Sequence, residues 1–175
     1  AEDLPRESLD GQINNYLANI VFSARPVRKL NILGRLSYEK RDNNTPRDVY
    51  LIVHNDANAQ ATALDSVDRR LNRPYSLEKL RFKLDAGVRL GMRNKLSFGY
   101  EYKDTNRDFS EVHSIEENIF KVKLSTGGFD FAGGWIEYNR SVRDGSEYIS
   151  NQPFLDGHDP AVITAITATD PDGLY

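Results

Sequence analysis

The chain has 175 residues, a mass of 19.9 kDa and a formal net charge of −3 from 23 basic and 26 acidic residues. The mean hydropathy is −0.60, and no run approaches the ~18 to 20 apolar residues that a spanning helix needs. A helical membrane protein is therefore excluded. No cysteine is present, which excludes disulfides, thiolate metal sites and covalent haem attachment. Charges of both signs are interspersed, so we expect no nucleic-acid partner.

The polar average is compatible with membrane-spanning strands, because only alternate residues of such a strand face lipid. Alternation with a period of two appears first over roughly 12–25 and 30–41, where apolar side chains fill the even positions. Arg25-Pro26-Val27-Arg28-Lys29 predicts a tight turn between these two strands.

A long polar loop is predicted over 42–74, and 57–71 within it is a candidate short helix. The cleanest alternation of the chain follows in a strand predicted over 75–90. Its apolar side consists of Leu80, Phe82, Leu84, Ala86, Val88 and Leu90, and its charged side of Lys79, Arg81, Lys83, Asp85 and Arg89. A strand of this kind separates two very different media.

Three more strands are predicted over 95–103, 111–125 and 129–142. The register of the last strand is ambiguous, so Trp135 could lie on either face. From 143 to 175 the chain carries Asp-Gly and Asp-Pro pairs around a small β-branched run, and we expect a second long loop.

The connections alternate in length along the chain. They are short near 25–29, 91–94 and 126–128, medium at 104–110, and long at 42–74 and from 143 onward. Outer-membrane barrels have short periplasmic turns and longer extracellular loops, whereas the turns of soluble sandwiches seldom segregate by length. The fold predicted for residues 1–175 is therefore all-β, a single segment of an antiparallel up-and-down transmembrane β-barrel in the bacterial outer membrane. Tyrosines near strand ends, such as Tyr38, Tyr102 and Tyr138, suit an aromatic girdle.

Six predicted strands are fewer than the about eight of the smallest closed single-chain barrel. Open edges would leave backbone groups unpaired in hydrocarbon. The missing strands come either from a longer parent chain or from further copies. We expect the first, because the sequence starts without a signal peptide and stops inside a loop.

Three stretches resemble a known family when they are taken in order. They are 23–26 through 41–46, then 72–75 through 96–102, then 143–148, and the likeness extends from about Leu4 to Pro153. This set is similar to the outer-membrane barrels associated with decahaem cytochromes, the MtrB/PioB type. After Pro153 the sequence departs from the family pattern.

The resemblance implies a large barrel that sheaths a periplasmic multihaem cytochrome in its lumen, so that electrons cross the membrane to or from an extracellular cytochrome or acceptor. Haem would be carried by that partner, and no cofactor would be bound by this chain. Basic side chains on the lumen wall would then contact an acidic cytochrome surface or haem propionates. The alternative for these side chains is a generic polar pore lining. The candidates are Arg35, Lys79, Arg81, Lys83, Arg89, Lys121 and Lys123.

Other candidate chemistry is weak. The three histidines, His54, His113 and His158, are far apart and have no partner at metal-ligand spacing, so we expect surface histidines. Asp42, Asn44 and Asp48 offer oxygen ligands for Ca²⁺, yet no calcium-loop motif occurs and solvated turns explain them better. Nothing orients the carboxylates for catalysis, and we expect no enzyme. Two other functions compete with the sheath: a general or substrate-specific diffusion porin, and a soluble β-sandwich or lipocalin-like carrier.

Overall fold

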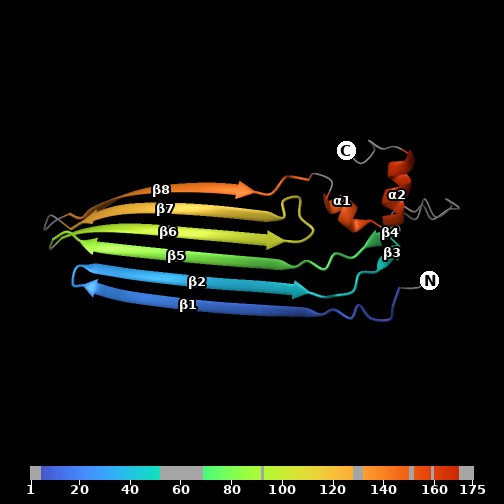
Figure 1. Ribbon diagram of the computed structural model, residues 1–175, viewed down its shortest axis with the longest axis horizontal. Helices are drawn as coiled ribbons and strands as arrows, with labels where there is room; N and C mark the ends of the chain where they lie inside the picture. The colour runs from blue at the N-terminus through green and yellow to red at the C-terminus, as the bar shows by residue number, and fades with distance from the viewer. Residues whose placement is uncertain are drawn as a thin grey trace.

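The computed structural model describes residues 5–51, 69–91, 93–127, 132–149, 152–158 and 160–169. Antiparallel strands dominate this part of the chain, and two short helices follow them (Figure 1). The strands are β1 (Ile13–Val27), β2 (Leu30–Asn43), β3 (Val49–Leu51), β4 (Arg69–Leu71), β5 (Leu77–Arg89), β6 (Asn94–Arg107), β7 (Ser114–Thr126) and β8 (Gly134–Gly145), and the helices are α1 (Gln152–Gly157) and α2 (Pro160–Thr169).

The long strands form one six-stranded sheet in the order β1-β2-β5-β6-β7-β8, and every neighbouring pair is antiparallel. The hairpin turns β1–β2, β5–β6 and β7–β8 lie together at one end, called the turn end below (Figure 1). The ends of β2, β6 and β8 and the starts of β1, β5 and β7 lie at the opposite end, called the loop end. The sheet is not closed, because β1 and β8 are its edges.

Both predicted long loops contain regular structure that the sequence reading missed. Within 42–74, β3 and β4 pair as a two-stranded sheet, and three-residue strands are too short to show a period of two. The proposed helix over 57–71 falls mostly outside the described residues, and its last three residues are β4. Within 143–175, the β-branched run read as loop forms α2, which begins at Pro160, a residue favoured at the first helical position.

The elements at the loop end form a small cap beside the main sheet (Figure 1). Arg6 joins the N-terminal segment to it through Asp48, with Nε 2.7 Å from Oδ2. Asn72 accepts a hydrogen bond from the backbone of Asp48 at 2.7 Å and donates one to the Pro46 carbonyl at 2.9 Å. These contacts order the flanks of the β3–β4 hairpin.

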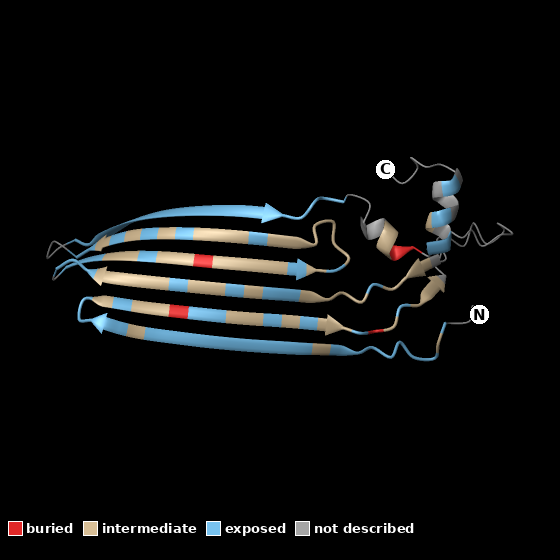
Figure 2. Cartoon of the chain, viewed as in Figure 1, coloured by how far each residue is buried: buried red, intermediate tan, exposed pale blue. Residues whose placement is uncertain are grey.

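Within the described residues, no layer packs on either side of the main sheet. No described side chain is fully buried, and both edge strands are exposed over most of their length (Figure 2). Large apolar side chains such as Ile20, Phe22 and Ile136 remain 59–69% exposed. A soluble domain would cover such a surface, so the sheet requires an environment that it does not itself supply.

Candidate functional surfaces

The register of the sheet sorts the side chains of all six strands into two faces. Ala86 pairs with Phe98, which pairs with Val122, and the same alignment continues outward to both edges. Apart from an irregularity between Ala24 and Val27 at the turn end of β1, even-numbered residues therefore share one face, here named the apolar face, and odd-numbered residues share the other, named the polar face. The pairing joins local alternation in six separate segments into two continuous surfaces.

The polar face is strongly basic. Its odd-numbered strand residues include thirteen Lys and Arg against five Asp and Glu, a net charge of +8, although the whole chain carries −3. On the apolar face, two basic and five acidic residues give −3. The structure places all seven predicted contact residues on the polar face: Arg35, Lys79, Arg81, Lys83, Arg89, Lys121 and Lys123.

Glu101 is the centre of an ion-pair network on this face. Its side chain is only 6% exposed, and its Oε1 lies 2.6 Å from Arg81 Nη2 and 3.6 Å from Lys103 Nζ. Lys103 also lies 3.1 Å from Glu117, which accepts a hydrogen bond from Ser141 at 2.7 Å. The network links β5, β6, β7 and β8 across the sheet and fixes their side chains.

Every acidic side chain on the polar strand face is paired. Lys79 lies 4.0 Å from Glu39, Lys83 lies 3.3 Å from Asp85, and Lys123 lies 3.4 Å from Glu137. Four of the seven predicted residues thus already have a carboxylate partner. Three of these partners lie on other strands, and the sequence did not reveal them because they depend on register. Within the described part of the chain, Arg35, Arg89 and Lys121 form no ion pair.

A hollow of about 370 Å³ opens on the polar face where β5 and β6 carry glycines. Gly87 and Gly99 lie at its floor, and Lys95, Lys121 and Asp85 are among its lining residues. A side chain at position 99 would meet Asp85 Oδ1 at 3.2 Å, so glycine keeps the hollow open. Lys95, which the sequence reading did not single out, brings a second cation without an ion pair among the described residues.

Trp135, whose face the sequence left open, lies on the polar face. Its register partner is Ser125, and the Lys123 ammonium lies 4.1 Å from the centroid of its ring. A cation at this distance is attracted by the ring electrons. Trp135 and Glu137 together hold Lys123 in place.

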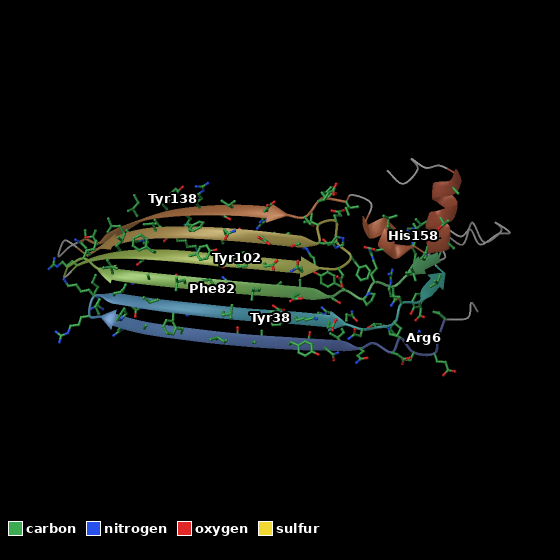
Figure 3. All side chains as sticks on the ribbon, viewed as in Figure 1. Arg6, Tyr38, Phe82, Tyr102, Tyr138 and His158 are labelled. Atoms are coloured by element: carbon green, nitrogen blue, oxygen red, sulfur yellow. The ribbon has the colours of Figure 1, made fainter. Side chains whose placement is uncertain are left out.

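The apolar face carries tilted pairs of aromatic rings and tyrosines with hydrogen-bonded hydroxyls. The ring centroids of Tyr100 and Phe120 are 5.1 Å apart. The Tyr38 hydroxyl donates to Glu78 at 3.0 Å, and that of Tyr100 donates to Asn118 at 2.8 Å. Both acceptors lie nearer the loop end than their tyrosines. Both hydroxyls are thus bonded toward the loop end. Figure 3 shows where Tyr38 lies along the sheet.

The remaining candidates do not assemble into a site. Asp48 is neutralised by Arg6, and no cluster of three or more His, Asp or Glu that could hold a metal occurs among the described residues. His113 is partly buried, with Nδ1 3.2 Å from the Arg107 carbonyl. The prediction of a surface histidine is wrong for His158, which is 4% exposed in the cap and contacts Arg70. His54 lies outside the described residues.

No helix in the described ranges is long and apolar enough to cross a membrane. The structure defines instead an open antiparallel sheet with an exposed apolar face and a basic face. The chain matches, over residues 1–168, the family described as "Putative outer membrane beta-barrel porin, MtrB/PioB".

The chain belongs to this family, and it is a bacterial outer-membrane protein. It is also 26% identical over 151 residues to the outer membrane protein MtrB of Shewanella baltica (strain OS185). That alignment covers 85% of this chain and 20% of the relative, so the chain spans about a fifth of the relative's length. The family is one of porin-like membrane proteins, which is not an enzyme class.

Proposed function

We propose that this sheet is an arc of a closed transmembrane β-barrel, with the apolar face toward lipid and the polar face toward the lumen. Strands β1 and β8 each have one edge without a strand partner among the described residues. Unpaired backbone groups in hydrocarbon cost several kcal/mol each, so further strands must complete both edges. A longer protein, as in the relative, supplies such strands more simply than an assembly of copies.

The barrel acts as a sheath for a multihaem c-type cytochrome and so supports electron transfer across the outer membrane. The observation that carries this proposal is the +8 charge of the polar face, together with membership in the MtrB/PioB family. Acidic protein surfaces and haem propionates are the groups that such a face attracts, and charge complementarity provides orientation and encounter rate. Haem belongs to the cytochrome in the lumen, and an extracellular cytochrome is a further partner of the complex.

Cations of the polar face that form no ion pair among the described residues are the best positions at which to test the sheath role. Reversing Lys79, Arg81 or Lys83 would also break ion pairs within the sheet, so a loss of binding would have two explanations. Arg35, Arg89 and Lys121 form no ion pair with a described carboxylate, so their reversal removes no member of the ion pairs around Glu101.

The experiment compares the triple variant R35E/R89E/K121E with the double variant K40E/R140E in the full-length protein. The control reverses the only two basic strand residues of the apolar face. Haem that co-purifies with the affinity-tagged barrel from outer membranes is the readout. We expect the triple variant to lose most of this haem and the control to keep it. Equal retention in both variants would sink the sheath proposal.

A diffusion porin is the second candidate, favoured by the family description and by the charge of the polar face. A lumen with this lining would conduct anions better than cations. Stable, anion-selective channels in a planar bilayer without cytochrome would favour the porin. A barrel that conducts little until the cytochrome is removed would favour the sheath. The soluble β-sandwich or lipocalin-like carrier is not a candidate, because the chain belongs to an outer-membrane family.

A further inference from the structure

The acidic side chains around the hollow of the polar face are already neutralised. The hollow of about 370 Å³ has two carboxylates in its lining, those of Asp85 and Glu137. Asp85 Oδ2 lies 3.3 Å from the Lys83 ammonium, and Glu137 Oε2 lies 3.4 Å from that of Lys123. Within the described residues, the lining therefore has no carboxylate left to neutralise a further cation.

Two other lysines of the lining, Lys95 and Lys121, have no carboxylate partner in the described part of the chain. A Cβ at Gly87 would meet Lys95 Cε at 2.9 Å and its Nζ at 3.6 Å, so the Lys95 side chain lies across this glycine. A Cβ at Gly99 would meet Lys121 Cβ at 3.4 Å and its Cδ at 3.9 Å, so Lys121 runs beside that one. The two glycines are diagonal neighbours in the register, about 7–8 Å apart. The glycine floor thus brings two ammonium groups to one hollow.

The row beside the hollow, toward the turn end, adds further positive charge. Arg89 and Lys95 are register partners, and the Arg89 amide donates to the Lys29 carbonyl at 2.9 Å. Three basic residues therefore lie side by side where β2, β5 and β6 reach the turn end (Figure 1). Like charges directly opposite each other in a sheet are destabilising. A bound anion would relieve this repulsion, which no described carboxylate relieves by an ion pair.

The rest of the lining suits a carboxylate that is carried on a short stem. Asn31 and Ser97 supply polar groups, and Leu33 supplies an apolar wall for methylene groups. A volume of about 370 Å³ falls within the range of small-ligand pockets, so the stem enters together with the carboxylate. Lys121 is half-buried, and a charge-assisted hydrogen bond from its ammonium to a carboxylate is roughly twice as strong as one between neutral groups.

We propose that the hollow seats a carboxylate that projects from the cytochrome in the lumen, held between the ammonium groups of Lys95 and Lys121. The inference rests on the proposed sheath role and adds one fixed contact point to it. The hollow opens on the polar face, which is the face toward the lumen in that role, so a lumen partner reaches it. A group seated in a recess resists sliding along the sheet, so this contact sets the position of the cytochrome along the barrel.

Haem that co-purifies with the full-length protein tests the two lysines. K95Q/K121Q removes both ammonium groups of the hollow. The control, R41Q/R143Q, removes two exposed cations of the same face near the loop end. We expect K95Q/K121Q to lose several-fold more haem than the control when the complex is washed with increasing salt. Heat-modifiable gel mobility checks that each variant has folded.

Gly87→Ala tests the seat without any change of charge. The new methyl group would take the space that the Lys95 side chain occupies and displace it from the floor. We expect this variant to lower haem retention in the unaltered background and to have no further effect in a K95Q background. Equal effects in both backgrounds would show that Gly87→Ala does not act through Lys95, and would overturn the seat.

A carbodiimide cross-link reads the contact directly, because this reagent joins an amine to a carboxylate with no spacer between them. The cross-linked complex is digested, and mass spectrometry searches for links from Lys95 and Lys121. We expect links to the cytochrome. A link to an acidic side chain and a link to a haem propionate both support the seat, and fragmentation tells which of the two carboxylates it holds.

Links only to Asp85 or Glu137 of this chain, or a haem loss no greater than in the R41Q/R143Q control, would overturn the seat. The sheath role is judged separately. If R35E/R89E/K121E still loses its haem, the sheath stands without the seat. If the unaltered barrel brings down no haem at all, the sheath proposal fails and the seat fails with it.

Discussion

Introducing an arginine in the middle of the apolar face tests the assignment of the two faces most directly. The apolar run on β5 extends from Leu80 to Leu90, which is about 33 Å along the strand at ~3.3 Å per residue. A tilt of about 45° reduces it to about 23 Å along the membrane normal, close to the ~25 Å apolar band of outer-membrane barrels. Leu84 then lies about 9 Å inside the boundary at Leu80, near the bilayer centre. Leu84→Arg should cost about 2–4 kcal/mol, or roughly 30- to 800-fold in the folding equilibrium.

Leu33→Arg is the matched control, because it makes the same chemical change on the polar face. Leu33 pairs in register with Asp85, so the new guanidinium would enter the polar face beside a carboxylate. We expect a cost within about 1 kcal/mol there. The full-length protein is refolded into phosphatidylcholine vesicles, and the folded fraction is followed by heat-modifiable gel mobility against urea concentration. A cost for Leu33→Arg equal to or above that for Leu84→Arg would refute the assignment of the faces.

Three further predictions follow from the polar face and the loop end. Glu101→Gln removes the carboxylate partner of Arg81 and one of the two carboxylate partners of Lys103 at a nearly buried position. It should lower stability by about 1–3 kcal/mol, measured as a urea midpoint. Gly99→Val should push against the side chains around the hollow and lower the amount of co-purified haem. The control is Gly134→Val, because the space around Gly134 is open and this variant should keep the haem. Equal haem in both variants would contradict a role for the hollow. The pKa of the Tyr148 hydroxyl is raised, first by the negative charge of Glu111, so Glu111→Gln should lower this pKa. An ultraviolet titration measures it, and Tyr148→Phe is the control that identifies the Tyr148 signal. The stabilisation by this contact is present below the ordinary tyrosine pKa and is lost as the pH rises through the raised value.

The six long strands and their two kinds of face follow from the sequence, because a period of two is a local property of each segment. Leu80 to Val88 alternate so strictly that β5 could be placed without any neighbour, although it begins at Leu77 and not at 75. The limits of β6 and β8 were less accurate. Both strands continue for several residues past the alternation, to Arg107 and Gly145, because cross-strand hydrogen bonds do not depend on polarity.

The tertiary structure alone decided how the segments align. The pairing of Arg81 with Glu101, and the lack of an ion pair for Lys121 among the described residues, depend on inter-strand register, which single-strand patterns do not encode. The burial of His158 depends on contacts with β4, far away in the sequence. The sequence by itself determined that one face of each strand is apolar and the other charged. Only the aligned sheet joined these faces into a continuous basic surface and a continuous apolar surface, because both arise from positions compared across strands.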